Sequence, residues 1–160
     1  MRIWIAAIAA TLVQPLVLLA FLAYDLIRSS DPIHGAGFMV LSVLAVAGAA
    51  VLLLGIPAFL LLRRFERANW TSLAIAGFAL GALPIAALSR PDTLSGYSAG
   101  QNWHGHYVET YISGVPTQYA WFIYGENVLH FGIHGLAGAL VFYAVWSRLQ
   151  AWDRPAVPTS

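Results

Sequence analysis

Apolar residues dominate the chain in four long runs that more polar segments separate. The runs cover residues 3–23, 36–62, 70–88 and 128–146. A helix needs about 20 apolar residues to cross roughly 30 Å of hydrocarbon, and each run approaches or exceeds that length. Each run is apolar on all sides, which is typical of helices in lipid, whereas a surface helix of a soluble protein has one apolar face. The pattern predicts an all-α membrane protein with four transmembrane helices.

The first run follows Arg2 and therefore has to be weighed against a cleaved signal peptide. It is longer than the usual apolar core of such a peptide, which has roughly 7–15 residues. The residues after it, Tyr24–Arg28, do not form a small-residue cleavage site. We therefore interpret this run as the first transmembrane helix.

The placement of arginine predicts the orientation of the four helices, because cytoplasmic loops are enriched in basic residues. Six arginines fall on one side of a four-span arrangement: Arg2, Arg63, Arg64, Arg67, Arg148 and Arg154. Arg28 and Arg90 fall on the other side. We expect an integral membrane protein, in the inner membrane if it is bacterial, with both termini in the cytoplasm. The loop 89–127 is then extracytoplasmic.

The composition agrees with one membrane unit. The 160 residues are 59% hydrophobic and 9% charged, against about 25% charged in a typical soluble domain. We expect a single domain over residues 1–152 and a disordered tail over 153–160. A net charge of +1 gives no reason to expect nucleic acid as a partner, and the absence of cysteine excludes disulfides and thiolate metal sites.

The outer loop, Ser89–Asn127, is polar and aromatic, and is too long for a simple connector. Its first part, to about Gly100, is rich in turn-forming residues and is expected to be irregular. Tyr107 and Tyr111 are spaced i, i+4, which predicts a short helix with both rings on one face. Thr117 is placed to cap a second helix that continues into the fourth span.

The aromatic residues of this loop are candidates for a binding surface: Trp103, Tyr107, Tyr111, Tyr119, Trp121 and Tyr124. Tyrosine and tryptophan favour the membrane interface, so the segment can also be interpreted as a cap that lies on the bilayer. A lid over an outward-facing cavity, or a docking surface for a membrane or periplasmic protein, is the functional alternative.

All five histidines fall on the outer side of this topology: His34, His104, His106, His130 and His134. Glu126, His130 and His134 are spaced i, i+4, i+8 and share one stripe of a helix. With His104 or His106 from the loop they are candidate ligands for a divalent metal or for haem. The spacing matches no established metal motif. A structural His134 would instead need a buried partner, for which Gln14, Tyr24 and Asp25 are candidates.

Small residues mark candidate contact faces between helices. Gly77 and Gly81 in the third run, and Gly135 and Ala139 in the fourth, are each four residues apart. Because lipid supplies little hydrophobic drive between helices, close approach at such positions sets the packing. We expect these two helices to pack through these faces. Pro15, Pro57 and Pro84 lie within three of the runs and are expected to bend them.

Hydrolase and phosphate-binding motifs are absent from the sequence. The leading hypothesis is therefore a non-enzymatic accessory, immunity or scaffold protein that binds through its outer aromatic loop. The first alternative is a metal- or haem-binding membrane protein that uses the outer histidines. The second is an oligomeric membrane enzyme or channel subunit, which needs several copies to build a deep polar site.

Overall fold

The structure is a computed structural model that describes residues 1–28 and 35–152. Within this part, four helices are long and apolar enough to cross a membrane: Arg2–Leu22, Gly37–Arg64, Trp70–Leu88 and Gln118–Ala151. The predicted number and order of apolar helices are thus confirmed. His34 and the tail 153–160 lie outside the described residues.

The first apolar stretch consists of two helices, α1 (Arg2–Leu12) and α2 (Gln14–Arg28), with a break at Val13. Pro15 explains the break, because it has no backbone N–H to donate and its ring crowds the preceding turn. The N–H of Val13 still bonds to the carbonyl of Ala9 at 3.1 Å, so the helical hydrogen bonding is interrupted only locally.

The second apolar stretch contains α3 (Ala36–Ala50), a π-helical turn η1 (Val51–Gly55) and α4 (Ile56–Arg64). Pro57 lies in the first turn of α4, where a missing N–H does least harm. The π turn immediately before it is a local adjustment of the kind that accommodates proline inside a long apolar helix.

The third and fourth apolar stretches are α5 (Trp70–Leu88) and α6 (Gln118–Ala151). Asn69 caps α5 by accepting a hydrogen bond from the Ser72 N–H at 2.9 Å. Pro84 lies inside α5, which continues around it to Leu88. The fourth helix begins ten residues before the predicted start at Val128, because the predicted second loop helix is continuous with it.

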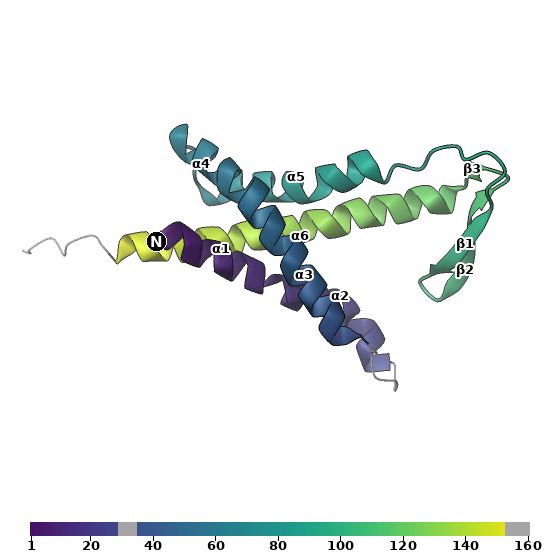
Figure 1. Ribbon diagram of the computed structural model, residues 1–160, viewed down its shortest axis with the longest axis horizontal. Coiled ribbons are helices and arrows are strands. Elements are labelled where there is room, and N and C mark those ends of the chain that lie inside the picture. Colours follow the sequence, from purple (N-terminus) through teal and green to yellow (C-terminus); the bar gives the residue numbers. More distant parts are fainter. Residues whose placement is uncertain (29–34, 153–160) are drawn as a thin grey trace, which may run out of the picture.

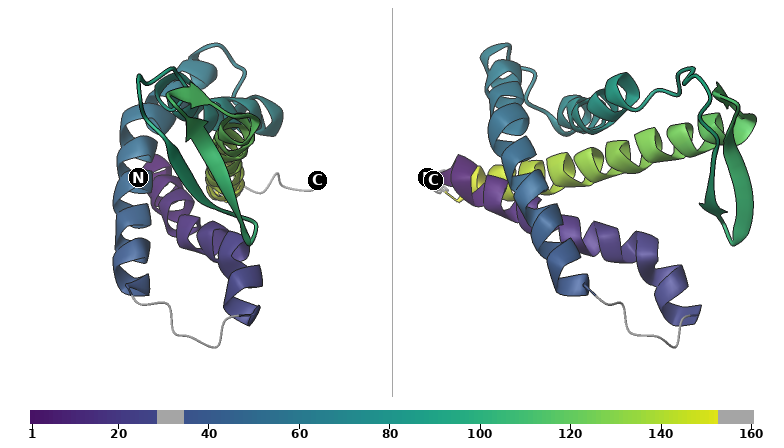
Figure 2. Two further views of the ribbon diagram at one scale, coloured as in Figure 1. Left: turned by 90° about the vertical axis from the view of Figure 1, so that its right-hand side faces the viewer. Right: turned by 45° about the vertical axis from the view of Figure 1, so that its right-hand side comes forward.

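Helix α6 forms the axis of the molecule, with α5 along one side and α1 along another (Figure 1). The α3–η1–α4 helix crosses the others steeply, so that α4 lies near α5 whereas α3 begins near α2 (Figures 1 and 2). The main core cluster lies toward the end that holds the N-terminus, and includes Ala6, Ala10, Phe59, Phe142 and Trp146. The helices therefore pack tightly at this end and diverge toward the other.

The loop after α5 forms a three-stranded antiparallel sheet in the order β1-β2-β3. The strands are β1 (Ala99–Trp103), β2 (His106–Ile112) and β3 (Val115–Pro116). The sheet lies at the far end of α6 and its β1–β2 hairpin projects sideways (Figure 1). The loop contains no helix or strand up to Ser98, as predicted, but the last two residues of the segment expected to be irregular, Ala99 and Gly100, belong to β1.

The predicted helix at Tyr107 and Tyr111 is wrong, because both residues belong to β2. This segment is rich in β-branched and aromatic residues, which fit a pleated strand better than a helix. A two-residue turn stands at each end of β2: His104–Gly105 with φ of 51° and 85°, and Ser113–Gly114 with φ of 50° and 87°. Two successive residues with positive φ form the tight turn that matches strand twist, and glycine is favoured there.

Candidate functional site

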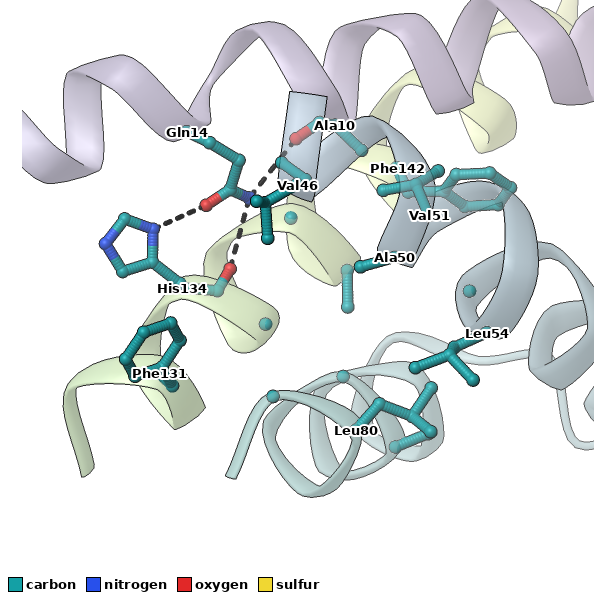
Figure 3. Close-up of a pocket in the computed structure, with 18 of the residues that line it drawn as sticks. Ala10, Gln14, Val46, Ala50, Val51, Leu54, Leu80, Phe131, His134 and Phe142 are labelled. Atoms are coloured by element: carbon teal, nitrogen blue, oxygen red, sulfur yellow. Dashed lines mark hydrogen bonds between the residues drawn. The ribbon is translucent and has the colours of Figure 1, made fainter. Parts of the chain in front are cut away.

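A hydrogen bond joins the side chains of Gln14 and His134 across the packed helices. The Gln14 Oε1 lies 2.7 Å from the His134 Nδ1, and Gln14 is only 5% exposed. Figure 3 shows the two side chains pointing toward one another from α2 and α6. Gln14 is one of the three partners named from the sequence. The other two, Tyr24 and Asp25, have side chains outside the described part.

The amide group of Gln14 fixes the protonation pattern of this contact. Its Nε2 donates to the carbonyl oxygens of Ala10 and His134, each at 3.2 Å. The amide oxygen must then accept, so the Nδ1 of His134 is the donor in the 2.7 Å contact. Gly138 makes room for the amide, since a Cβ there would lie 2.8 Å from the Gln14 Nε2. All hydrogen-bonding groups of the glutamine side chain are thereby used.

His130 and Phe21 complete a ring cluster around His134. The centroid of the His130 ring lies 5.0 Å from that of His134 and 4.0 Å from that of Phe21. The Phe21 ring is stacked on His134 at 5.8 Å. Both histidines are half-buried. Their place one turn apart on α6 follows directly from the i, i+4 spacing.

The predicted metal ligands do not assemble into one site. Glu126 and His104 are neighbours, with Oε1 and Nε2 3.3 Å apart, whereas His130 and His134 face Phe21. His106 begins β2 and is exposed. Among residues 1–28 and 35–152, no three His, Cys, Asp or Glu side chains come close enough to hold an ion. Glu126, His130 and His134 all lie on α6, as predicted. Glu126, however, contacts Trp103 and His104 of the hairpin.

Trp103 and Glu126 attach the sheet to α6. The Trp103 Nε1–H donates to the Glu126 Oε2 at 2.7 Å. The indole also packs on Tyr119 and Phe122 of α6, with ring centroids 5.7 and 6.1 Å away. Val108 is buried on the same sheet. A charge-assisted hydrogen bond and a ring cluster therefore hold the hairpin to the helix.

Tyr97, Tyr107 and Tyr111 form the outward face of the sheet, which we call the tyrosine face. Tyr107 and Tyr111 alternate with the buried Val108 along β2, so they point to the opposite side. The rings of Tyr97 and Tyr111 meet edge to face at 5.4 Å. Tyr107 is 74% exposed, and its ring crosses Gly100, where a Cβ would leave no space for it. Tyr97 was not predicted, because it falls in the segment expected to be irregular.

Three of the predicted surface aromatics have other contacts. Tyr119 packs beneath the hairpin against Trp103. Tyr124 donates its hydroxyl to the Ala86 carbonyl at 2.8 Å and so connects α6 to α5. Trp121 packs against Tyr124 and lies under the Arg90 guanidinium, 5.9 Å from it. Some of the six predicted aromatic residues therefore hold elements of the structure together, and the others lie on the exposed face of the sheet.

The small residues of α5 and α6 lie in direct backbone contact. A Cβ on Gly77 would lie 2.5 Å from the carbonyl oxygen of Gly135, and its other neighbour is Ala139. A Cβ on Gly81 would lie 3.3 Å from the Gly135 Cα. Since Gly77 and Gly81 flank the centre of α5, Gly135 and the adjacent His134 are level with the middle of that helix.

An apolar groove of about 480 Å³ lies between α3–η1–α4, α5 and α6 (Figure 3). Its walls include Ala50, Leu54, Leu80 and Phe131, and Phe59 and Phe142 close one end. Its polar lining residues are Gln14, Ser42, His130 and His134. The groove follows from the divergence of α3 away from α5.

Comparisons with protein-family models, curated proteins and solved structures find no match. Function therefore has to be argued from the geometry. Within the described residues, the polar side-chain contacts of the histidines include the hydrogen bond of His134 to Gln14 and the ion-pair contact of His104 with Glu126. This arrangement can hold elements together and present a surface to a partner.

Proposed function

We propose that the protein is an integral membrane accessory or scaffold protein that docks a protein partner through its tyrosine face. In this proposal the four apolar helices cross the membrane, the inner membrane if the source is bacterial. Both termini and the α4–α5 connection are cytoplasmic. The sheet stands on the extracytoplasmic side.

The lengths of the helices and the position of the arginines support this orientation. Helix α6 has 34 residues and is about 51 Å long, well beyond a hydrocarbon layer of roughly 30 Å. Its first turns can therefore project from the membrane and hold the sheet above it. Arg63, Arg64 and Arg67 gather at the opposite end, as basic residues do on the cytoplasmic side.

The observation that favours docking is the combination of a firm anchor and an exposed ring surface. Trp103, Glu126, Tyr119 and Phe122 fix one side of the hairpin, which leaves Tyr107 and its neighbours free on the other side. Exposed, pre-organised tyrosine is enriched at protein interfaces, because it buries a large area at a small cost in side-chain entropy. An interfacial cap that lies on lipid would use the same residues, so the test has to separate these two roles.

A photoreactive benzophenone side chain in place of Tyr107 tests the proposal in native membranes. The control carries the same group in place of Phe65, an aromatic residue that is 64% exposed near the end of α4. We expect ultraviolet light to yield one discrete protein adduct from position 107 and not from position 65. Adducts with lipid alone at position 107 would identify the sheet as an interfacial cap and contradict the proposal.

A further inference from the structure

The groove between α3–η1–α4, α5 and α6 has the dimensions of a single hydrocarbon chain. The residues of α3, η1 and α4 that line it run from Ser42 to Phe59, which corresponds to about 25 Å of helix. A volume of about 480 Å³ over this length gives a mean cross-section of about 20 Å². Carbon atoms in contact at about 4 Å give a hydrocarbon chain a section of the same order.

The volume also argues against a transmembrane helix as the occupant. A helix about 10 Å across has a section of about 80 Å², roughly four times that of the groove. A single hydrocarbon tail is narrow enough to enter between the walls, whereas a helix is not.

The lining agrees with an occupant that has no polar group along most of its length. Gln14 uses both amide N–H groups and its oxygen within the protein, so it offers nothing to a ligand. The other polar lining residues, Ser42, His130 and His134, lie toward the end that holds the sheet and leave the α4 end apolar. Val46 and Leu54 are 66% and 41% exposed, and their side chains border the open space (Figure 3). The side chains of both walls lose van der Waals contacts when such a groove is empty, and a water molecule in it would find few hydrogen-bond partners. Both effects favour an apolar occupant.

The groove is closed at one end and widens toward the other. Phe59 is 1% exposed, and its ring packs on Phe142 and Trp146 with centroids 4.8 and 4.9 Å away. These rings form a floor near the α4 end, while α3 separates from α5 toward its own start (Figure 2). A chain can therefore enter from the end of the molecule that holds the sheet.

We propose that this groove binds one acyl chain of a phospholipid from the leaflet on the side of the sheet, with the end of the tail on Phe59 and Phe142. The proposal uses the membrane location but not the docking role of the tyrosine face. Loss of either conclusion leaves the other standing, since the two experiments probe different residues.

Photolabelling in defined vesicles tests the acyl-chain site. The protein is reconstituted into phosphatidylethanolamine and phosphatidylglycerol that contain a trace of phospholipid with a diazirine in one tail. After illumination and digestion, tandem mass spectrometry assigns the label to single residues, and we expect it on Leu54, Leu80 and Phe131. Ala50→Trp should lower this labelling about fivefold by filling the groove. Ala49→Trp, on the neighbouring exposed position outside the lining, should leave it unchanged.

Thermal unfolding of both variants checks that they fold. If Ala50→Trp does not fold, Ala76→Phe on the α5 wall, with Ala87→Phe as its control, provides the same comparison. Equal labelling of wild type and a folded groove variant would overturn the proposal. Equal label on the groove residues and on Leu53 and Leu83, which are exposed outside the groove, would also overturn it. A dimer in which the second copy covers the groove and prevents labelling would do the same.

Discussion

Gln14 and His134 are 120 positions apart in the chain, and their side chains meet at 2.7 Å. Their contact lies level with the middle of α5, which would be near the centre of the hydrocarbon layer in the proposed membrane orientation. A polar side chain at such a depth is costly unless it is paired, so each residue explains the burial of the other. The contact also connects α2 to the axial helix α6 beyond the break at Val13.

A double-mutant cycle at Gln14 and His134 should show coupling. Gln14→Leu leaves the Nδ1–H of His134 unpaired, and His134→Leu leaves the glutamine oxygen unpaired, so each change should lower the free energy of unfolding. The double variant should cost less than the sum of the two, with a coupling energy of about 0.5–2 kcal/mol. Unfolding in detergent provides the measurement.

The control for this cycle is Gln101→Leu, which removes an exposed glutamine on β1. It should change the free energy of unfolding by less than about 0.5 kcal/mol. Strict additivity of Gln14→Leu and His134→Leu would show that the pair contributes nothing to stability.

Two glycines of α6 should respond oppositely to alanine. A Cβ on Gly135 would meet the Gly77 carbonyl and lie 3.2 Å from the Gly81 nitrogen, whereas a Cβ on Gly125 has nothing within 4 Å. We expect Gly135→Ala to destabilise the protein by about 1–3 kcal/mol, because α5 and α6 must separate. Gly125→Ala should be neutral or stabilising by up to about 1 kcal/mol, because it favours the helix.

Melting temperatures of the two alanine variants in one detergent decide between these expectations. If Gly135→Ala melted at or above the wild-type temperature, the close approach of α5 and α6 would be wrong. The same comparison separates packing from helix propensity, since both substitutions add one methyl group to the same helix.

Trp103→Phe should loosen the β1–β2 hairpin. The change removes the N–H that donates to Glu126 but keeps an aromatic ring among Tyr119 and Phe122. Loss of one charge-assisted hydrogen bond of about 1 kcal/mol corresponds to roughly fivefold faster amide exchange in β1 and β2. Hydrogen–deuterium exchange with mass spectrometry measures it. Trp121→Phe is the matched control, and equal exchange in the two variants would mean that Glu126 does not hold the hairpin.

The number and order of the long apolar helices could be predicted because composition alone determines them. Trp70–Leu88 has the predicted bounds, since Asn69 and Ser89 flank an uninterrupted apolar run. A partner for His134 could be named because a buried glutamine and a buried histidine each need one. The choice of Gln14 over Tyr24 and Asp25 as this partner depended on helix packing, which the sequence pattern alone does not determine.

The outer sheet was missed because a spacing of four residues is ambiguous. Tyr107 and Tyr111 share a face on a helix, where four residues make about one turn, and equally on a strand, where side chains alternate. The signals for the strand were the His104–Gly105 and Ser113–Gly114 pairs on either side of a β-branched segment. The metal prediction depended on the same loop, since the hairpin tip brings His104 to Glu126 and away from His134.

The absence of native cysteine allows a direct test of the proposed orientation. Gln101→Cys lies on the exposed edge strand β1, and Arg64→Cys lies at the end of α4. In intact cells, we expect a membrane-impermeant maleimide to label position 101, and to label position 64 only after the membrane is permeabilised. The reverse pattern would invert the topology and remove the sheet from the extracytoplasmic side. Labelling of both positions in intact cells would mean that the chain does not cross the membrane between Arg64 and Gln101, and the arginine argument would then be wrong.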